Sequence, residues 1–224
     1  MNGTVAKSVL IAAVIAGVSY LLGMNLAFPP ALMIVWKGSG VALLAVWAAL
    51  NARDMDGWLI AAVMAFGALG DVLLEATGLE AGAGAFLVGH AVAMLLYFRN
   101  WRPHITFSQR TLSALVVPLS VFIAFSLTQD AMIAVYTFFV AGMTASAWTS
   151  RFPRFRTGMG AMMFLASDLL IFARMSFLEE TVGISVTIWV LYFLGQLLII
   201  LGVVGTLRAP GGGLVPSPER LPKS

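Results

Sequence analysis

The sequence predicts an all-α membrane protein: a polytopic bundle of eight transmembrane helices with both termini in the cytoplasm. Of its 224 residues, 60% are hydrophobic and 10% are charged, and the mean hydropathy is +0.96. Soluble domains contain only about 45–50% apolar residues. Apolar segments long enough to cross a bilayer recur along the chain, and basic residues concentrate in alternate connections between them. Together these observations indicate an integral multi-pass protein.

A transmembrane helix needs roughly 20 mostly apolar residues. The segments that meet this requirement are 5–23, 30–50, 57–76, 82–98, 111–127, 131–149, 158–176 and 184–207. Residues that begin or end helices separate them: Pro29 and Pro30 open the second segment, Gly78 closes the third, Pro103 follows the fourth and Pro153 precedes the seventh. The connections are short, so we expect neighbouring helices to be antiparallel and packed together.

The charges in the connections predict the orientation. The Lys and Arg residues outside the spans all lie on the side of the N-terminus: Lys7, Arg53, Arg99, Arg102, Arg110, Arg151, Arg154, Arg156, Arg208, Arg220 and Lys223. The connections on the opposite side contain Glu80, Asp130, Glu179 and Glu180, and no Lys or Arg. The positive-inside rule therefore predicts cytoplasmic termini and an even number of spans, in what we expect to be a bacterial inner membrane. The net charge of +3 then reflects topology and contact with anionic lipid, and no nucleic-acid partner is expected.

The chain is predicted to form one transmembrane domain, 1–208, and a disordered cytoplasmic tail, 209–224, which is rich in proline, glycine and charge. The first span, with Lys7 ahead of an apolar run, also has features of a signal peptide, but its cleavage would leave seven spans where the charges favour eight. The sequence has no cysteine and only two histidines, His90 and His104, so no metal site and no cofactor are expected. The sequence pattern does not define an oligomeric state.

Polar side chains inside the predicted spans mark a candidate site, because ionised groups are costly in lipid. The charged ones are Lys37, Asp71, Glu75, Asp168 and Arg174, and further polar groups are His90, Tyr136, Tyr192 and Gln196. All of them fall in the extracytoplasmic half or near the middle of the membrane. We therefore expect one polar cavity, open toward the extracytoplasmic side, to contain them.

Three acids against two bases leave one excess negative charge if every group ionises, so we expect one carboxyl group to hold its proton. A protonated acid beside an ionised one suits general acid–base chemistry. Asp71 and Glu75, four residues apart, share a helix face. Arg174 points roughly 120° away from Asp168 around its helix, which makes Glu75 its expected partner.

Structural roles are the alternative for several of these residues. The expected pair of Glu75 and Arg174 is as readily a structural ion pair as a functional one. His90, Tyr136 and Tyr192 could be packing residues with a hydrogen-bond partner. Lys37 lies near enough to the end of its helix to extend its ammonium group to the interface.

Four stretches, FGALGDVLLEATG, AFLVGHAVAMLLYF, MFLASDLLIFARMSF and VLYFLGQLLII, resemble in this order the lysoplasmalogenase family, also called YhhN-like, of eight-span membrane proteins. The features that carry the resemblance are Gly70 with Asp71, Phe86 with His90, Ser167 with Asp168, and Tyr192 with Gln196. Lys37 matches an early lysine of the family, but Gly38 follows it where the family usually has proline.

The resemblance implies a hydrolase that cleaves the vinyl ether bond of lysoplasmalogen, a lysophospholipid, and releases a fatty aldehyde and glycerophosphocholine or glycerophosphoethanolamine. Asp71 and Asp168, with His90, are the expected catalytic residues. The expected supporting residues, which orient water or bind the headgroup, are Lys37, Glu75, Tyr136, Arg174, Tyr192 and Gln196. A proton-coupled transporter and a lipid-binding bundle without turnover remain alternatives, because buried charges serve both equally well.

Overall fold

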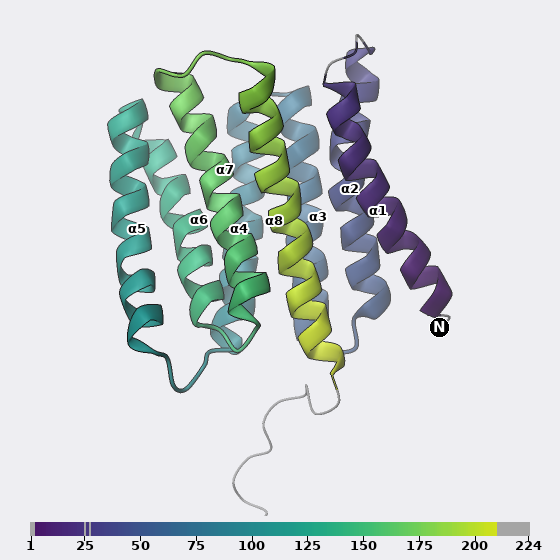
Figure 1. Cartoon of the computed structure of the whole chain (residues 1–224), viewed down its shortest axis with the longest axis vertical. Coiled ribbons are helices and arrows are strands. Elements are labelled where there is room, and N and C mark those ends of the chain that lie inside the picture. The colour runs from purple at the N-terminus through teal and green to yellow at the C-terminus, as the bar shows by residue number, and fades with distance from the viewer. Residues whose placement is uncertain (1–2, 25, 27, 210–224) are drawn as a thin grey trace, which may run out of the picture.

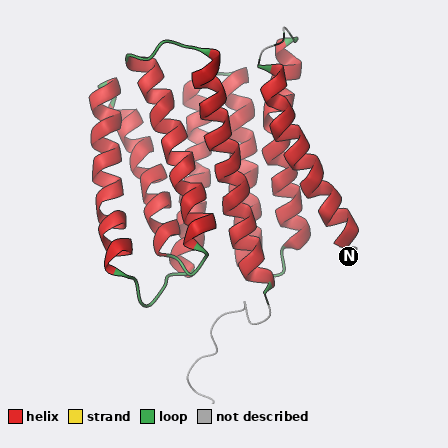
Figure 2. Cartoon of the chain, viewed as in Figure 1, coloured by secondary structure: helices red, strands yellow, loops and turns green. Residues whose placement is uncertain are grey.

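The computed structural model describes residues 3–24, 26 and 28–209, which form helices joined by short connections, with no strand among them (Figure 2). The long helices are α1 (Gly3–Gly23), α2 (Pro30–Asn51), α3 (Met55–Ala76), α4 (Leu79–Arg99), α5 (Phe107–Thr128), α6 (Ala131–Thr149), α7 (Met159–Ser176) and α8 (Val182–Arg208). A π-helical turn, η1 (Arg154–Gly158), leads into α7. In this part of the chain, 8 spans are long and apolar enough to cross a membrane, which confirms the predicted number. The predicted disorder of the tail concerns residues 210–224, which lie outside the described ranges.

Several helices begin before their apolar runs because polar side chains cap them. The Asp54 side chain accepts a hydrogen bond from the Gly57 backbone N–H at 2.9 Å, so α3 begins at Met55. Thr106 and Gln109 form a reciprocal capping box, which starts α5 four residues earlier than its apolar run suggests. Apolar content predicted where the helices lie, and the caps fix where they begin.

The helices form two layers (Figure 1). One layer contains α5, α7, α8 and α1, and the other contains α6, α4, α3 and α2. Most helices pack against their neighbours in sequence, but α4 packs against α6, whereas α5 lies against α6 and α7. The helix α8 contacts α2 and α3 across the interface between the layers. Residues far apart in the sequence therefore meet at this interface.

Gly3 and Arg208 lie at the same end of the bundle, which we call the basic end because the connections there carry Arg53, Arg102 and Arg151 (Figure 1). The opposite, acidic end carries Glu80, Asp130, Glu179 and Glu180. At the basic end the buried carboxylate of Asp56 accepts hydrogen bonds from Arg99 Nε at 2.9 Å and Asn100 Nδ2 at 2.8 Å. Arg99, assigned from the sequence to topology, therefore also links α3 to α4.

Replacing Asp56 with alanine is expected to destabilise the bundle without removing a site residue. The buried Asn100 amide and the half-exposed Arg99 would each lose an acceptor, so the free energy of unfolding should fall by about 1–3 kcal/mol. Denaturation in detergent measures this change. Asp54→Asn is the matched control, because asparagine also caps helices. Equal stability of Asp56→Ala and the parent protein would contradict the assignment.

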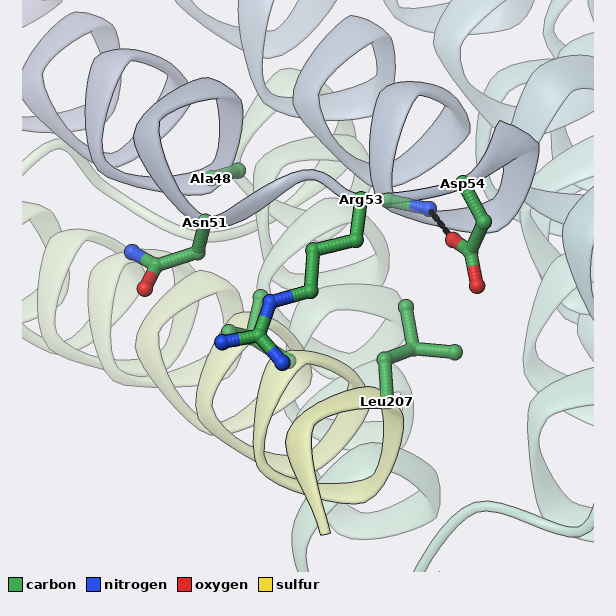
Figure 3. A pocket seen from close by; sticks show the side chains of 7 residues that line it. Ala48, Asn51, Arg53, Asp54 and Leu207 are labelled. Atoms are coloured by element: carbon green, nitrogen blue, oxygen red, sulfur yellow. Dashed lines mark hydrogen bonds between the residues drawn. The ribbon is translucent and has the colours of Figure 1, made fainter. Parts of the chain in front are cut away.

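A small pocket of about 10 Å³ lies at the basic end between α2, the connection to α3, and α8 (Figure 3). The Arg53 side chain extends from this connection toward α8, and the dashed line marks the cap that Asp54 provides. Ligand pockets usually enclose about 300–1,000 Å³. This pocket is therefore not a candidate for substrate binding.

Candidate functional site

Asp71 lies on α3 at the interface between the layers and is 2% exposed. Its Oδ2 accepts a hydrogen bond of 2.7 Å from the Tyr192 hydroxyl of α8. Tyr192 is also buried, and its ring lies 5.5 Å from that of Trp189 on the same helix. This hydrogen bond connects the two layers and fixes the position of the first predicted acid.

Asp168 on α7 is the second buried acid, 7% exposed. Its Oδ2 accepts a hydrogen bond of 2.8 Å from the Tyr136 hydroxyl of α6. That hydroxyl also lies 3.2 Å from Nε2 of His90 on α4. A hydroxyl both donates and accepts, so with Asp168 ionised the donors run from His90 through Tyr136 to Asp168, and with Asp168 protonated they run in reverse. The three residues can therefore relay a proton.

Two phenylalanine rings lie against both hydrogen-bonded groups. The Phe164 ring centroid is 5.1 Å from His90 and 5.2 Å from Tyr192. The Phe86 centroid is 5.9 Å from both Phe164 and Tyr192, and the ring stacks on His90 at 6.4 Å. These rings surround the hydrogen-bonded groups with apolar surface, and low polarity strengthens electrostatic interactions there.

The two acids belong to one contiguous cluster of side chains. The ring of Tyr192, the hydrogen-bond donor to Asp71, has its centroid 5.2 Å from that of Phe164. The Phe164 ring in turn lies 5.1 Å from that of His90, which is hydrogen-bonded to the Tyr136 that contacts Asp168. The structure thus brings together the predicted Asp71, Asp168, His90, Tyr136 and Tyr192.

Glycine explains how Phe86 reaches the site. A Cβ atom at Gly70 would lie 2.7 Å from the Phe86 ring, closer than carbon atoms pack. Gly67, one turn earlier on α3, similarly leaves room for the Gln196 amide, which would lie 2.9 Å from a Cβ there. The small residues beside Asp71 therefore allow α4 and α8 to approach it.

Lys37 on α2 pairs with Glu75 on α3, with Nζ and Oε1 2.5 Å apart. The Lys37 side chain is 13% exposed and that of Glu75 is 43% exposed, so the pair lies at the margin of the site. A Cβ at Gly38 would meet the Val72 side chain at 2.7 Å. Glycine after Lys37 therefore lets α2 lie close enough to α3 for the pair to form.

The predicted pairing of Glu75 with Arg174 is wrong. Arg174 donates to Glu180 Oε1 at 3.1 Å, in the connection from α7 to α8, and to Ser185 Oγ at 3.3 Å, near the start of α8. The helix α3 packs against α2, α4 and α8, not against α7, so Glu75 meets Lys37 instead. Arg174 thus forms its contacts at the acidic end, and Asp71, Asp168 and Glu75 are not its partners.

The expectation of one open polar cavity also needs correction. Beside His90 and Gln196 lies a cavity of about 10 Å³, and the two aspartates are not among the residues that line it. The site residues instead pack against one another with their polar atoms hydrogen-bonded. Asp71 and Asp168 are 2% and 7% exposed, so in this conformation a lipid has little access to either carboxyl group.

Sequence reasoning missed two residues that complete the surroundings: Trp189 and Tyr97. Trp189 precedes Tyr192 by three residues and Tyr97 follows His90 by seven, so each shares a helix face with a predicted site residue. Helical spacing from the predicted residues could have found both. It could not show which partners they meet on other helices.

Comparison with known protein families shows which family the chain belongs to. The model of the YhhN family matches residues 32–203, about three quarters of the chain. The chain belongs to the YhhN family. The YhhN match runs from α2 to α8 and includes every predicted site residue from Lys37 to Gln196, while α1 lies before it. Neither the curated proteins nor the solved structures gave a match.

Proposed function

We propose that the protein is a membrane hydrolase that cleaves the vinyl ether bond of lysoplasmalogen. The observation that carries the proposal is the pair of buried aspartates, each held by a tyrosine hydroxyl, in one cluster of side chains inside the bundle. Membership in the YhhN family supports the same function. The products are a fatty aldehyde and glycerophosphocholine or glycerophosphoethanolamine.

The chemistry requires an acid and a carboxylate in one site. A protonated aspartic acid donates its proton to the outer alkene carbon, and the ether carbon becomes an oxocarbenium ion. The second aspartate, ionised, stabilises this positive charge and accepts a proton from the water that attacks the cation. As the hemiacetal breaks its bond to the glycerol oxygen, the second aspartate returns its proton to that oxygen, and the hemiacetal hydroxyl gives its proton to the first aspartate as the aldehyde forms. One water is consumed, and both carboxyl groups return to their starting states.

The neighbours of the aspartates have distinct roles in this mechanism. His90 and Tyr136 relay protons to or from Asp168 along their hydrogen bonds. Tyr192 fixes the orientation of the Asp71 carboxyl group. Phe86 and Phe164 supply the apolar surface against which the alkenyl chain lies.

Lys37 provides the contact for the phosphate headgroup. An ammonium group has three donors, and Glu75 takes one of them, which leaves donors for a phosphate oxygen. The basic connections at the opposite end favour a bundle whose basic end faces the cytoplasm. The headgroup would then approach from the extracytoplasmic leaflet.

Lys37→Met is expected to raise the KM for lysoplasmalogen about 10-fold with little change in kcat, because it removes a charge-assisted contact remote from the reacting bond. Steady-state aldehyde release measures both constants. Lys7→Met, which removes the same charge at the exposed start of α1, is the matched control. An unchanged KM in Lys37→Met would exclude a headgroup contact.

The direct test uses purified protein in detergent with lysoplasmalogen, and free fatty aldehyde is measured by trapping with a hydrazine. We expect aldehyde to accumulate with time and in proportion to protein. The matched lysolipid with a saturated ether chain should give none, because it has no alkene to protonate. No aldehyde from the vinyl ether would overturn the proposal.

Transport is the competing function, and helix continuity argues against it. Transporter sites are typically built from helices that are broken near the middle of the membrane. Among the described residues, the helices that carry the aspartates and their partners are unbroken at those positions. Saturable lipid uptake into vesicles without aldehyde release would favour transport.

A further inference from the structure

Tyr97 has a buried hydroxyl group without a hydrogen-bond partner in the described part of the chain. It lies near the end of α4, its side chain is 0% exposed, and its ring contacts that of Phe152 with centroids 6.0 Å apart. An unpaired buried hydroxyl is costly, and native proteins usually satisfy such groups with a protein atom or an ordered water. The mechanism proposed above gives Tyr97 no role.

Tyr97 also lines the cavity beside His90 and Gln196. Its residues are buried apart from Phe86, so the cavity lies within the bundle. Its volume is about 10 Å³, which is close to the minimum that one water molecule needs. The phenol, imidazole and carboxamide groups around it provide the polar partners that a buried water requires.

The helical register explains this arrangement. Tyr97 follows His90 by two turns of α4, so both lie on one face. Side chains on a helix lean toward its N-terminus, which directs Tyr97 back toward His90. Between them lies Ala93, whose small side chain also lines the cavity and leaves space open. Gln196 faces the same space from α8.

We propose that this cavity binds a water molecule that is held by the Tyr97 hydroxyl against His90 and Gln196, and that this site supplies the water consumed in the hydrolysis. The supply role rests on the proposed function, whereas the water site does not. Hydrolysis consumes one water at aspartates that are buried in a membrane-spanning bundle. A water molecule bound next to His90 meets that need. His90 is hydrogen-bonded to Tyr136, and Tyr136 is hydrogen-bonded to Asp168. Tyr97 is then a positioning residue.

Two buried methionines test the water site without any substrate. X-ray radiolysis generates hydroxyl radicals from bound water, and these oxidise the side chains beside it. Met143 lines the cavity and is 2% exposed, whereas Met64 is 0% exposed and is not one of the lining residues. We expect Met143 to be oxidised faster than Met64 in the parent protein, and Tyr97→Phe to remove the difference. Equal protection of both methionines in the parent protein would overturn the water site.

The supply role is tested by turnover of the same variant. Tyr97→Phe keeps the ring and removes one hydroxyl, and its kcat should fall about 5- to 10-fold with KM unchanged. Thr157→Val is the matched control, because Thr157 is another buried hydroxyl without a partner in the described ranges but does not line this cavity. An unchanged kcat in Tyr97→Phe would overturn the supply role.

A second variant guards against misfolding of the first. Ala93→Val fills the cavity and keeps the Tyr97 hydroxyl, so it should lower both Met143 oxidation and kcat. If Met143 is oxidised selectively but the parent protein releases no aldehyde, the water site stands and the proposed function fails.

Discussion

Asp71→Asn is expected to lower kcat for lysoplasmalogen by about 10²–10⁴-fold, the usual contribution of general acid–base catalysis. The asparagine amide oxygen can still accept the hydrogen bond from Tyr192, so the local structure is kept. The amide cannot donate or accept the catalytic proton near neutral pH. Aldehyde release by the purified variant, compared with its melting temperature in detergent, separates lost chemistry from lost folding.

Asp54→Asn is the matched control for this variant. It makes the same substitution on the same helix, at an exposed position where asparagine keeps the N-terminal cap. Its turnover should equal that of the parent protein. Full turnover by folded Asp71→Asn would remove Asp71 from the mechanism.

Asp168→Asn should cause a loss of similar size, because it removes the second carboxyl group while an acceptor for the Tyr136 hydroxyl remains. The two aspartates act in one proton-transfer sequence, so their effects should not multiply. We expect the double variant with Asp71→Asn to be about as slow as the slower single variant. Single-turnover aldehyde release measures all three proteins.

Asp130→Asn is the control for this second substitution, since Asp130 caps α6 at the acidic end and asparagine can replace it there. A double variant whose loss equals the product of the single losses would show that the aspartates act independently. The shared acid–base mechanism would then be wrong.

The number and placement of the helices followed from the sequence because a bilayer imposes a minimum apolar length on every span. The same constraint identified the acids as candidates for function. A carboxyl group inside such a span costs too much free energy to be there without a role. Tyr136 and Tyr192 could be predicted as supporting residues because both lie inside predicted transmembrane helices. Which tyrosine holds which aspartate could not be predicted.

The wrong ion pair has a physical source, the order in which helices pack. A helical period gives the face of a residue but not the helix opposite it. The angle between Arg174 and Asp168 on their helix favoured Glu75 as the partner of Arg174, but the contact of α2 with α3 pairs Glu75 with Lys37. The Asp56 and Asn100 network was missed because polar residues are ordinary at the ends of spans and attract no notice there.

The two-layer arrangement connects access to the site with the hydrogen bonds of both acids. The bond from Tyr192 to Asp71 and the bond from Tyr136 to Asp168 both cross from one layer to the other, whereas the Lys37 and Glu75 pair joins helices within one layer. A lipid that widened the interface between the layers would therefore act on the partners of both carboxyl groups at once and leave the ion pair unchanged.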